Sequence, residues 1–132
     1  MADEAPKPKR VWWIGSSRDD VRSFPEDVRY EIGTALRAAQ NGQPHPALKV
    51  LKGFGGATVW EIRADDVGGT FRLVYTVEFP GVIAALHAFQ KKSKKGIQTP
   101  KEELQRIKRR LADAKEQYEQ PRKQGRNNGD AR

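Results

Sequence analysis

The chain has 132 residues, a formal net charge of +8 and no cysteine. This length suits a single domain, and the absence of cysteine excludes disulfide bonds, thiolate catalysis and cysteine-ligated zinc. No apolar run approaches the roughly 18 residues that span a membrane, and the N-terminus carries no apolar signal segment, so we expect a soluble cytoplasmic protein. The two histidines lie far apart in the sequence, and we expect no metal site and no cofactor.

Most of the excess positive charge lies in one segment. Residues 91–110 contain nine lysines and arginines against two glutamates. Such a cluster is typical of a surface that binds nucleic acid or another polyanion, although a solvated helix face beside a basic loop gives the same pattern. Charge alone does not distinguish RNA, DNA and an acidic protein as the partner.

The first third of the chain predicts one strand followed by helices. Residues 11–14 (VWWI) read as a short strand, in which Trp12 and Trp13 must point to opposite faces. Residues 16–20 offer a helix start, and a second helix follows within residues 23–42, where apolar side chains recur three or four positions apart. We expect a helical hairpin or a kinked helix that packs on a sheet.

The centre of the chain reads as a run of strands. Residues 48–51 begin the sheet, and the glycine-rich residues 53–56 read as a turn because they lack the flanking pattern of a phosphate-binding loop. Residues 59–91 then alternate apolar and polar positions through three runs, with turn residues at both joints. This pattern predicts an antiparallel meander.

The register of this meander can be predicted from how its two faces separate. Pairing Arg63 with Arg72, and Arg72 with His87, gives one almost wholly apolar face: Trp60, Ile62, Phe71, Leu73, Tyr75, Val77, Val82, Ala84, Leu86 and Ala88. The opposite face then carries Val59, Glu61, Arg63, Arg72, Val74, Thr76, Ile83, Ala85, His87 and Phe89. Its polar groups gather toward one end. Two arginines, a histidine and Glu61 are therefore predicted to share a patch suited to a phosphate-bearing ligand.

A long helix is predicted for the last part of the chain. Residues 99–102 (TPKE) have the spacing of a capping box with proline at the first helical position. An apolar stripe follows, formed by Leu104, Ile107, Leu111, Ala114 and Tyr118. We predict a flexible N-terminal segment over residues 1–10, a folded domain over 11–118 and a disordered basic tail over 119–132.

The polar face offers the groups that metal-free RNA cleavage needs. In that reaction the ribose 2′-hydroxyl is the nucleophile, a base removes its proton, cations stabilise the phosphorane and an acid protonates the leaving 5′-oxygen. His87 can exchange a proton near neutral pH. Cations are available from Lys49, Lys52, Arg63, Arg72 and Lys91.

Simpler interpretations exist for the same residues. His87 could be a hydrogen-bonded structural histidine, and the two arginines could pair with nearby acidic side chains across the hairpin. Tyr75 falls on the apolar face and is expected in the core. Three further basic residues would contact phosphates for affinity rather than transfer protons: Lys92, Lys94 and Lys95.

Three segments carry a family resemblance. They are PALKVLKGFGGATVWEIR, FRLVY and IAALHAFQKKSKKGIQTPKEELQRIKRRLADA. Over residues 11–118 the chain resembles the HigB-type toxins of the RelE/ParE toxin-antitoxin superfamily, especially the phage-derived branch. The resemblance implies a compact α+β domain, in which N-terminal helices pack on one face of an antiparallel sheet, a C-terminal helix follows and the other face of the sheet is concave.

The resemblance also implies an activity and its partners. Such toxins usually act as metal-independent, ribosome-dependent mRNA endonucleases, and they are held inactive by a cognate antitoxin, often a helix-turn-helix protein that also binds the operon DNA. By position, Arg63, Arg72 and His87 are the expected catalytic residues, with His87 preferred as the general base. The expected RNA-binding residues are Lys49, Lys52, Lys91, Lys92, Lys94 and Lys95. Tyr118 lies in the predicted helix stripe and does not match the C-terminal tyrosine of RelE.

Two alternatives to the ribonuclease remain at this point. The superfamily includes DNA gyrase inhibitors on the same scaffold, and the chain could also be a phage-derived nucleic-acid-binding protein without toxicity. Because Arg72 and His87 lie off the predicted apolar face, we expect alanine variants of either residue to leave the fold intact.

Overall fold

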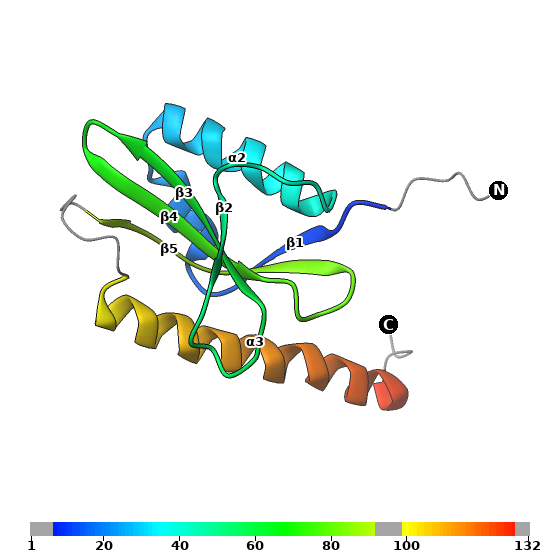
Figure 1. Ribbon diagram of the computed structural model, residues 1–132. Coiled ribbons are helices and arrows are strands. Elements are labelled where there is room, and N and C mark those ends of the chain that lie inside the picture. Colours follow the sequence, from blue (N-terminus) through cyan, green and yellow to red (C-terminus); the bar gives the residue numbers. More distant parts are fainter. Residues whose placement is uncertain (1–6, 92–98, 129–132) are drawn as a thin grey trace.

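The computed structural model describes residues 7–91 and 99–128, with side chains described as far as residue 120. Within these ranges a five-stranded sheet lies between helices on both of its faces (Figure 1). The elements in chain order are β1 (Arg10–Trp13), α1 (Ser17–Arg22), α2 (Glu26–Gln40), β2 (Leu48–Leu51), β3 (Val59–Asp66), β4 (Gly69–Thr76), β5 (Val82–Lys91) and α3 (Lys101–Asn128). The predicted α+β class is confirmed, with N-terminal helices on one face and a helix at the C-terminal end.

The sheet has the strand order β1-β5-β4-β3-β2. Strands β2 to β5 are antiparallel neighbours, as the meander pattern predicts. β1 differs because it pairs in parallel with β5, with Arg10 opposite Val82. The first strand and the last strand of the chain therefore lie side by side, and β2 forms the opposite edge.

The predicted register is right for one hairpin and wrong for the other. Arg63 pairs with Arg72 as predicted, but Arg72 pairs with Phe89, and His87 pairs with Val74. The register shifts between Val74 and Tyr75, which marks a β-bulge against β5. An extra residue in one strand reverses the side to which the following side chains point.

Because of this bulge, the side chains in the first half of β5 point to the faces opposite to those predicted. Ile83 and Ala85 pack in the cluster beneath α2, whereas Val82, Ala84 and Leu86 pack in the cluster beneath α3. This is the opposite of the prediction for all five residues. Residues 82–86 (VIAAL) are apolar at every position, so the sequence contains no alternation from which their direction could be read.

Both faces of the sheet are covered by packed side chains. Beneath α2, helix residues such as Val28 and Ile32 contact Ile62 and Leu73 of the sheet. Beneath α3, Ile107 and Ala114 are fully buried in a second cluster. The two tryptophans of β1 divide between these clusters as predicted, Trp13 on the α2 side and Trp12 on the α3 side.

α3 makes the largest departure from the expected architecture. It lies across the sheet face opposite α2 (Figure 1), the face that the family resemblance implies to be open and concave. The helix runs to Asn128, beyond the predicted domain end at residue 118. Within the described ranges, no helix is long and apolar enough to cross a bilayer.

Candidate functional site

A set of buried and half-buried polar side chains lies where the first part of α3 meets the sheet. We call this set the polar seam and define it as Glu61, Arg72 and His87 from the sheet, with Thr99, Glu103 and Arg110 from the α3 side. Strand alternation directs the three sheet residues to the α3 face, because each follows or precedes a neighbour that packs beneath α2. The predicted grouping of arginine, histidine and Glu61 on one face is therefore present.

Arg72 forms a buried ion pair with Glu61. The Nη1 atom of Arg72 lies 2.7 Å from Oε2 of Glu61, and the two side chains are 3% and 4% exposed. The same nitrogen donates a longer hydrogen bond of 3.3 Å to the hydroxyl of Thr99, next to the start of α3. Removing one partner of a pair buried in this way strongly destabilises a protein, because the remaining charge has no water to solvate it. Arg72 is therefore part of a buried contact, which removes the premise on which its alanine variant is expected to leave the fold intact.

His87 is held between an acid and a base of α3. Its Nε2 atom lies 2.6 Å from Oε1 of Glu103, and its Nδ1 atom lies 3.3 Å from Nη1 of Arg110. Arg110 can only donate, so Nδ1 accepts and Nε2 carries the hydrogen that is shared with Glu103. The ring also stacks on Phe89, with centroids 5.2 Å apart. In this arrangement neither ring nitrogen faces solvent.

Burial sets the protonation of His87. Desolvation lowers the pKa of His87 below its ordinary value, the Glu103 carboxylate opposes this effect, and the charges of Arg110 and Arg106 add to it. A neutral imidazole agrees with the tautomer that the hydrogen bonds require. His87 is also a buried residue, so the same premise fails for its alanine variant.

Arg110 connects the polar seam to the N-terminal half of the chain. Its guanidinium donates to the carbonyl of Leu86 at 3.0 Å and to the hydroxyl of Ser16 at 3.1 Å. Leu86 is the extra residue of the β-bulge, so the irregular strand presents an acceptor where Arg110 can reach it. Gly15 allows this approach, since a Cβ atom there would lie 3.0 Å from Nε of Arg110.

Sequence reasoning missed Glu103 and Arg110. Both lie on one flank of α3, seven positions apart with Ile107 between them, which places them on the same side of the helix as its apolar stripe. That spacing is the signal in the sequence that indicates these two residues. It shows that they share a side of the helix with the apolar stripe, but not which face of the sheet that side covers.

The remaining predicted site residues lie around the seam or outside the described ranges. Lys49 in β2 and Lys52 just after it are exposed, and Lys49 pairs across the strands with Glu61. Arg63 is partly exposed and forms an ion pair of 3.3 Å with Asp65. Lys91 ends β5 and is half-buried. Three residues of the predicted RNA-binding set lie in the segment that is not described: Lys92, Lys94 and Lys95.

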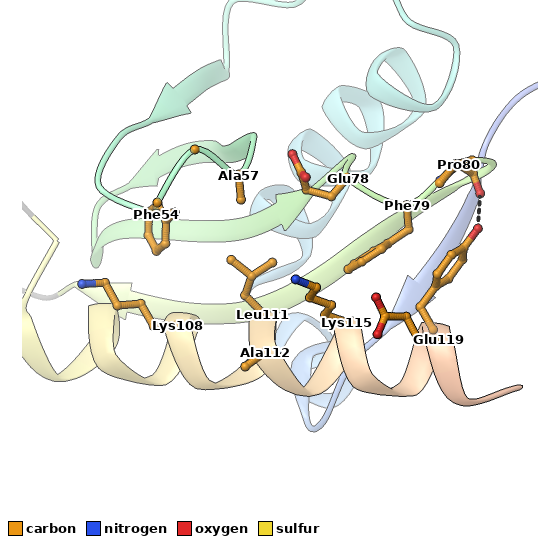
Figure 2. Close-up of a pocket in the computed structure, with 13 residues that line it drawn as sticks. Phe54, Ala57, Glu78, Phe79, Pro80, Lys108, Leu111, Ala112, Lys115 and Glu119 are labelled. Atoms are coloured by element: carbon orange, nitrogen blue, oxygen red, sulfur yellow. Dashed lines mark hydrogen bonds between the residues drawn. The ribbon is translucent and has the colours of Figure 1, made fainter. Parts of the chain in front are cut away.

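A groove runs beside the middle of α3 (Figure 2). It has a volume of about 880 Å³, and Phe54, Phe79 and Leu111 give it an apolar lining. Tyr118 also lines the groove, and its hydroxyl donates to the carbonyl of Pro80 at 3.3 Å. Tyr118 thus has a packing role on the helix stripe, as predicted. Across the described residues, no group of three or more His, Asp or Glu side chains could hold a metal ion.

Comparisons with known proteins identify a family. One solved structure, the toxin-antitoxin complex RelBE2 from Mycobacterium tuberculosis, aligns with 69% of this chain and 100% of its own, at 17% identity and a TM-score of 0.47. No curated protein matches the sequence. Residues 19–112 match the family described as "Phage derived protein Gp49-like (DUF891)". The phage-derived character is thus confirmed, while the HigB branch stays a prediction. The chain belongs to the phage-derived Gp49-like family.

Proposed function

We propose that this protein is the toxin of a toxin-antitoxin pair and that it cuts mRNA on the ribosome as a metal-independent endoribonuclease. The observation that carries the proposal is the position of Arg72 and His87, which lie two residues apart along neighbouring strands on one face, with Arg63 directly opposite Arg72. Membership of a phage-derived family agrees with the resemblance of the sequence to phage-derived HigB-type toxins.

Each residue has a role in the proposed reaction. Arg63 and Arg72 stabilise the negative charge that develops on the phosphorane. His87 removes the proton of the 2′-hydroxyl, for which a neutral imidazole is the required form. The lowered pKa of His87 keeps the ring neutral at pH 7 and supports this assignment.

The proposal requires the first turn of α3 to leave the sheet before RNA binds. Glu103 occupies Nε2 of His87, and Thr99 lies against Arg72, so a phosphodiester cannot reach these groups while α3 is seated. These contacts are polar, and water can replace them, so they oppose opening less than apolar contacts of equal area. We propose that ribosome or mRNA binding provides the free energy for this displacement.

Exposed cations around the seam are proposed to hold the RNA backbone. Lys49 and Lys52 lie on one side of it, and Lys91 lies at the end of β5. Lys92, Lys94 and Lys95 follow Lys91 in the sequence and belong to the same proposal. Phosphate contacts of this kind make binding fall with salt concentration.

The proposed partners are mRNA, the ribosome and a cognate antitoxin, which we expect to be a helix-turn-helix protein. An antitoxin that repressed its own operon would bring this chain to DNA only indirectly. The proposal places the protein in the cytoplasm, where translation occurs.

The test is cleavage of a defined mRNA by purified protein, with and without translating ribosomes, and with EDTA in the ribosome-free arm. His87→Gln is the informative variant because glutamine keeps a polar side chain in the seam but cannot act as a base. Arg37→Gln is the control, since Arg37 is exposed near the end of α2 on the other side of the sheet.

We expect wild type and Arg37→Gln to cut mRNA only on ribosomes, and His87→Gln to fold without cutting. Full activity of a folded His87→Gln would reject the role of His87. The nuclease proposal itself fails if folded wild-type protein cuts no RNA in either arm.

The burial of Arg72 and His87 favours a second candidate function. A protein that needs neither group exposed could inhibit DNA gyrase or bind nucleic acid without catalysis. Induced expression separates these cases: gyrase inhibition triggers the DNA-damage response without loss of mRNA, and a passive binding protein leaves growth unchanged.

A further inference from the structure

A second cavity lies on the sheet face opposite the polar seam, near the C-terminal end of α2. Its volume is about 440 Å³, within the range of small-molecule sites. Leu48 and Val77 from the sheet side and Ala39 from α2 give it an apolar wall. None of the residues in the polar seam lines it, so this cavity is independent of the proposed nuclease function.

Two aromatic rings form one side of the cavity. Trp60 and Tyr75 are cross-strand partners in β3 and β4, and their rings are nearly parallel, at an interplanar angle of 8° with centroids 6.5 Å apart. Parallel rings that are offset in this way present a flat apolar surface against which a further planar ring can pack.

Tyr75 brings a hydroxyl group to the lining of this cavity. The residue as a whole is 2% exposed. Burial raises the pKa of Tyr75 to about 12, so the hydroxyl keeps its proton and can donate. A ligand that carries an acceptor atom would give this hydroxyl a hydrogen bond inside the cavity.

Two further donors lie in the lining. The amide of Ala47 donates to Nδ1 of His45 at 3.0 Å, which leaves Nε2 of the neutral ring as a donor. Lys9 contributes an ammonium group, and its backbone is fixed to the end of α2 by two hydrogen bonds with Gln40, of 2.9 and 2.7 Å. The cation is therefore attached to a well-anchored segment.

Negative charge is lacking in the described part of this cavity. Its lining contains no carboxylate side chain, and the side-chain acceptor that it offers beside the imidazole is the amide oxygen of Gln43. The last four carbonyls of α2 already accept hydrogen bonds, three of them from residues 41–43 and that of Gln40 from Lys9. A negatively charged ligand therefore meets no carboxylate in this lining, and its charge suits the ammonium of Lys9.

We propose that this cavity binds a small aromatic carboxylate. The aromatic ring packs against Trp60 and Tyr75, and the carboxylate accepts from the Tyr75 hydroxyl, from Nε2 of His45 and from the Lys9 ammonium. This assignment concerns the α2 face only and stands whether or not the chain is a nuclease.

The test is titration of the isotopically labelled protein with phenylacetate, followed by NMR shifts and calorimetry. Phenylacetamide has the ring without the charge, and acetate has the charge without the ring. The informative variants are Tyr75→Phe and Lys9→Gln, and Lys7→Gln is the matched control because Lys7 is exposed and does not line the cavity.

We expect saturable binding of phenylacetate, with shifts centred on Gly42 and the Trp60 indole. Lys9→Gln and Tyr75→Phe should each weaken it roughly tenfold, the loss of one hydrogen bond to a charged group, while Lys7→Gln binds as wild type. Three results would each overturn the proposal: no saturable binding, equal affinity for phenylacetamide, or shifts centred on the groove beside Phe54 and Phe79.

Discussion

Replacing Arg72 alone would leave the Glu61 carboxylate without a counter-charge inside the protein. The two side chains are 3% and 4% exposed, so water cannot compensate for the missing guanidinium. Removing one partner of such a pair costs about 3–5 kcal/mol of unfolding free energy, whereas replacing both partners with apolar residues of similar size is often neutral. We therefore expect Arg72→Ala to be severely destabilised and the double variant Glu61→Leu/Arg72→Met to be close to wild type.

Urea unfolding at pH 7 measures this difference directly. The free energy of unfolding of a small domain falls by about 1–3 kcal/mol per molar urea. The urea midpoint of Arg72→Ala should therefore be lower than that of wild type by roughly one to several molar, and the double variant should recover most of this loss. Arg63→Ala is the matched control, because Arg63 and Asp65 are 37% and 58% exposed and an exposed pair contributes about 1 kcal/mol at most. A loss for Arg72→Ala no larger than that for Arg63→Ala would refute the reasoning that α3 seals this pair from water.

Three further predictions concern the contacts of α3. The pKa of His87 in the folded protein is below its ordinary value of 6.5, so the free energy of unfolding should fall as the pH drops below about 6.5 toward the folded pKa. His87→Gln should remove that part of the pH dependence, which urea titrations at pH 5 to 8 would measure. An identical profile in both proteins would count against a buried neutral ring. Ile107→Ala should cost about 2–5 kcal/mol because the side chain is fully buried, while Gln105→Ala, on the exposed side of α3, should leave the melting temperature nearly unchanged. Gly15→Ala should lower the melting temperature, since Gly15 has φ of +56° and a Cβ atom there would meet Arg110; a melting temperature equal to wild type would contradict that contact.

Local patterns in the sequence were sufficient for much of the fold. Alternation in β3 and β4 and the spacing of apolar residues in α2 and α3 each reflect a single element, so they can be read without knowing the neighbours. The bulge between β4 and β5 could not be read in this way. Residues 82–86 are uniformly apolar, and either direction of the side chains would have buried them equally well.

Only part of the site could be predicted from the sequence, and the reason is related. Alternation placed Arg72, Glu61 and His87 on one face, but it carried no information on what covers that face. Val59, Val74 and Phe89 lie on the same face and are buried beneath α3. Their apolar character indicates that a helix covers this face of the sheet. The family resemblance implies the opposite, an open face.

The parallel pairing of β1 with β5 has a consequence for how the chain acquires its structure during synthesis. Arg10 emerges from the ribosome early, but its partner Val82 emerges only after the whole central hairpin. Trp12 also packs with Phe79, which precedes β5, and with Tyr118, which lies within α3 and emerges later still. Contacts between such distant positions slow folding, since a long segment must be ordered before they form. β1 is thus made before the other described elements and is among the last of them to be fixed in place.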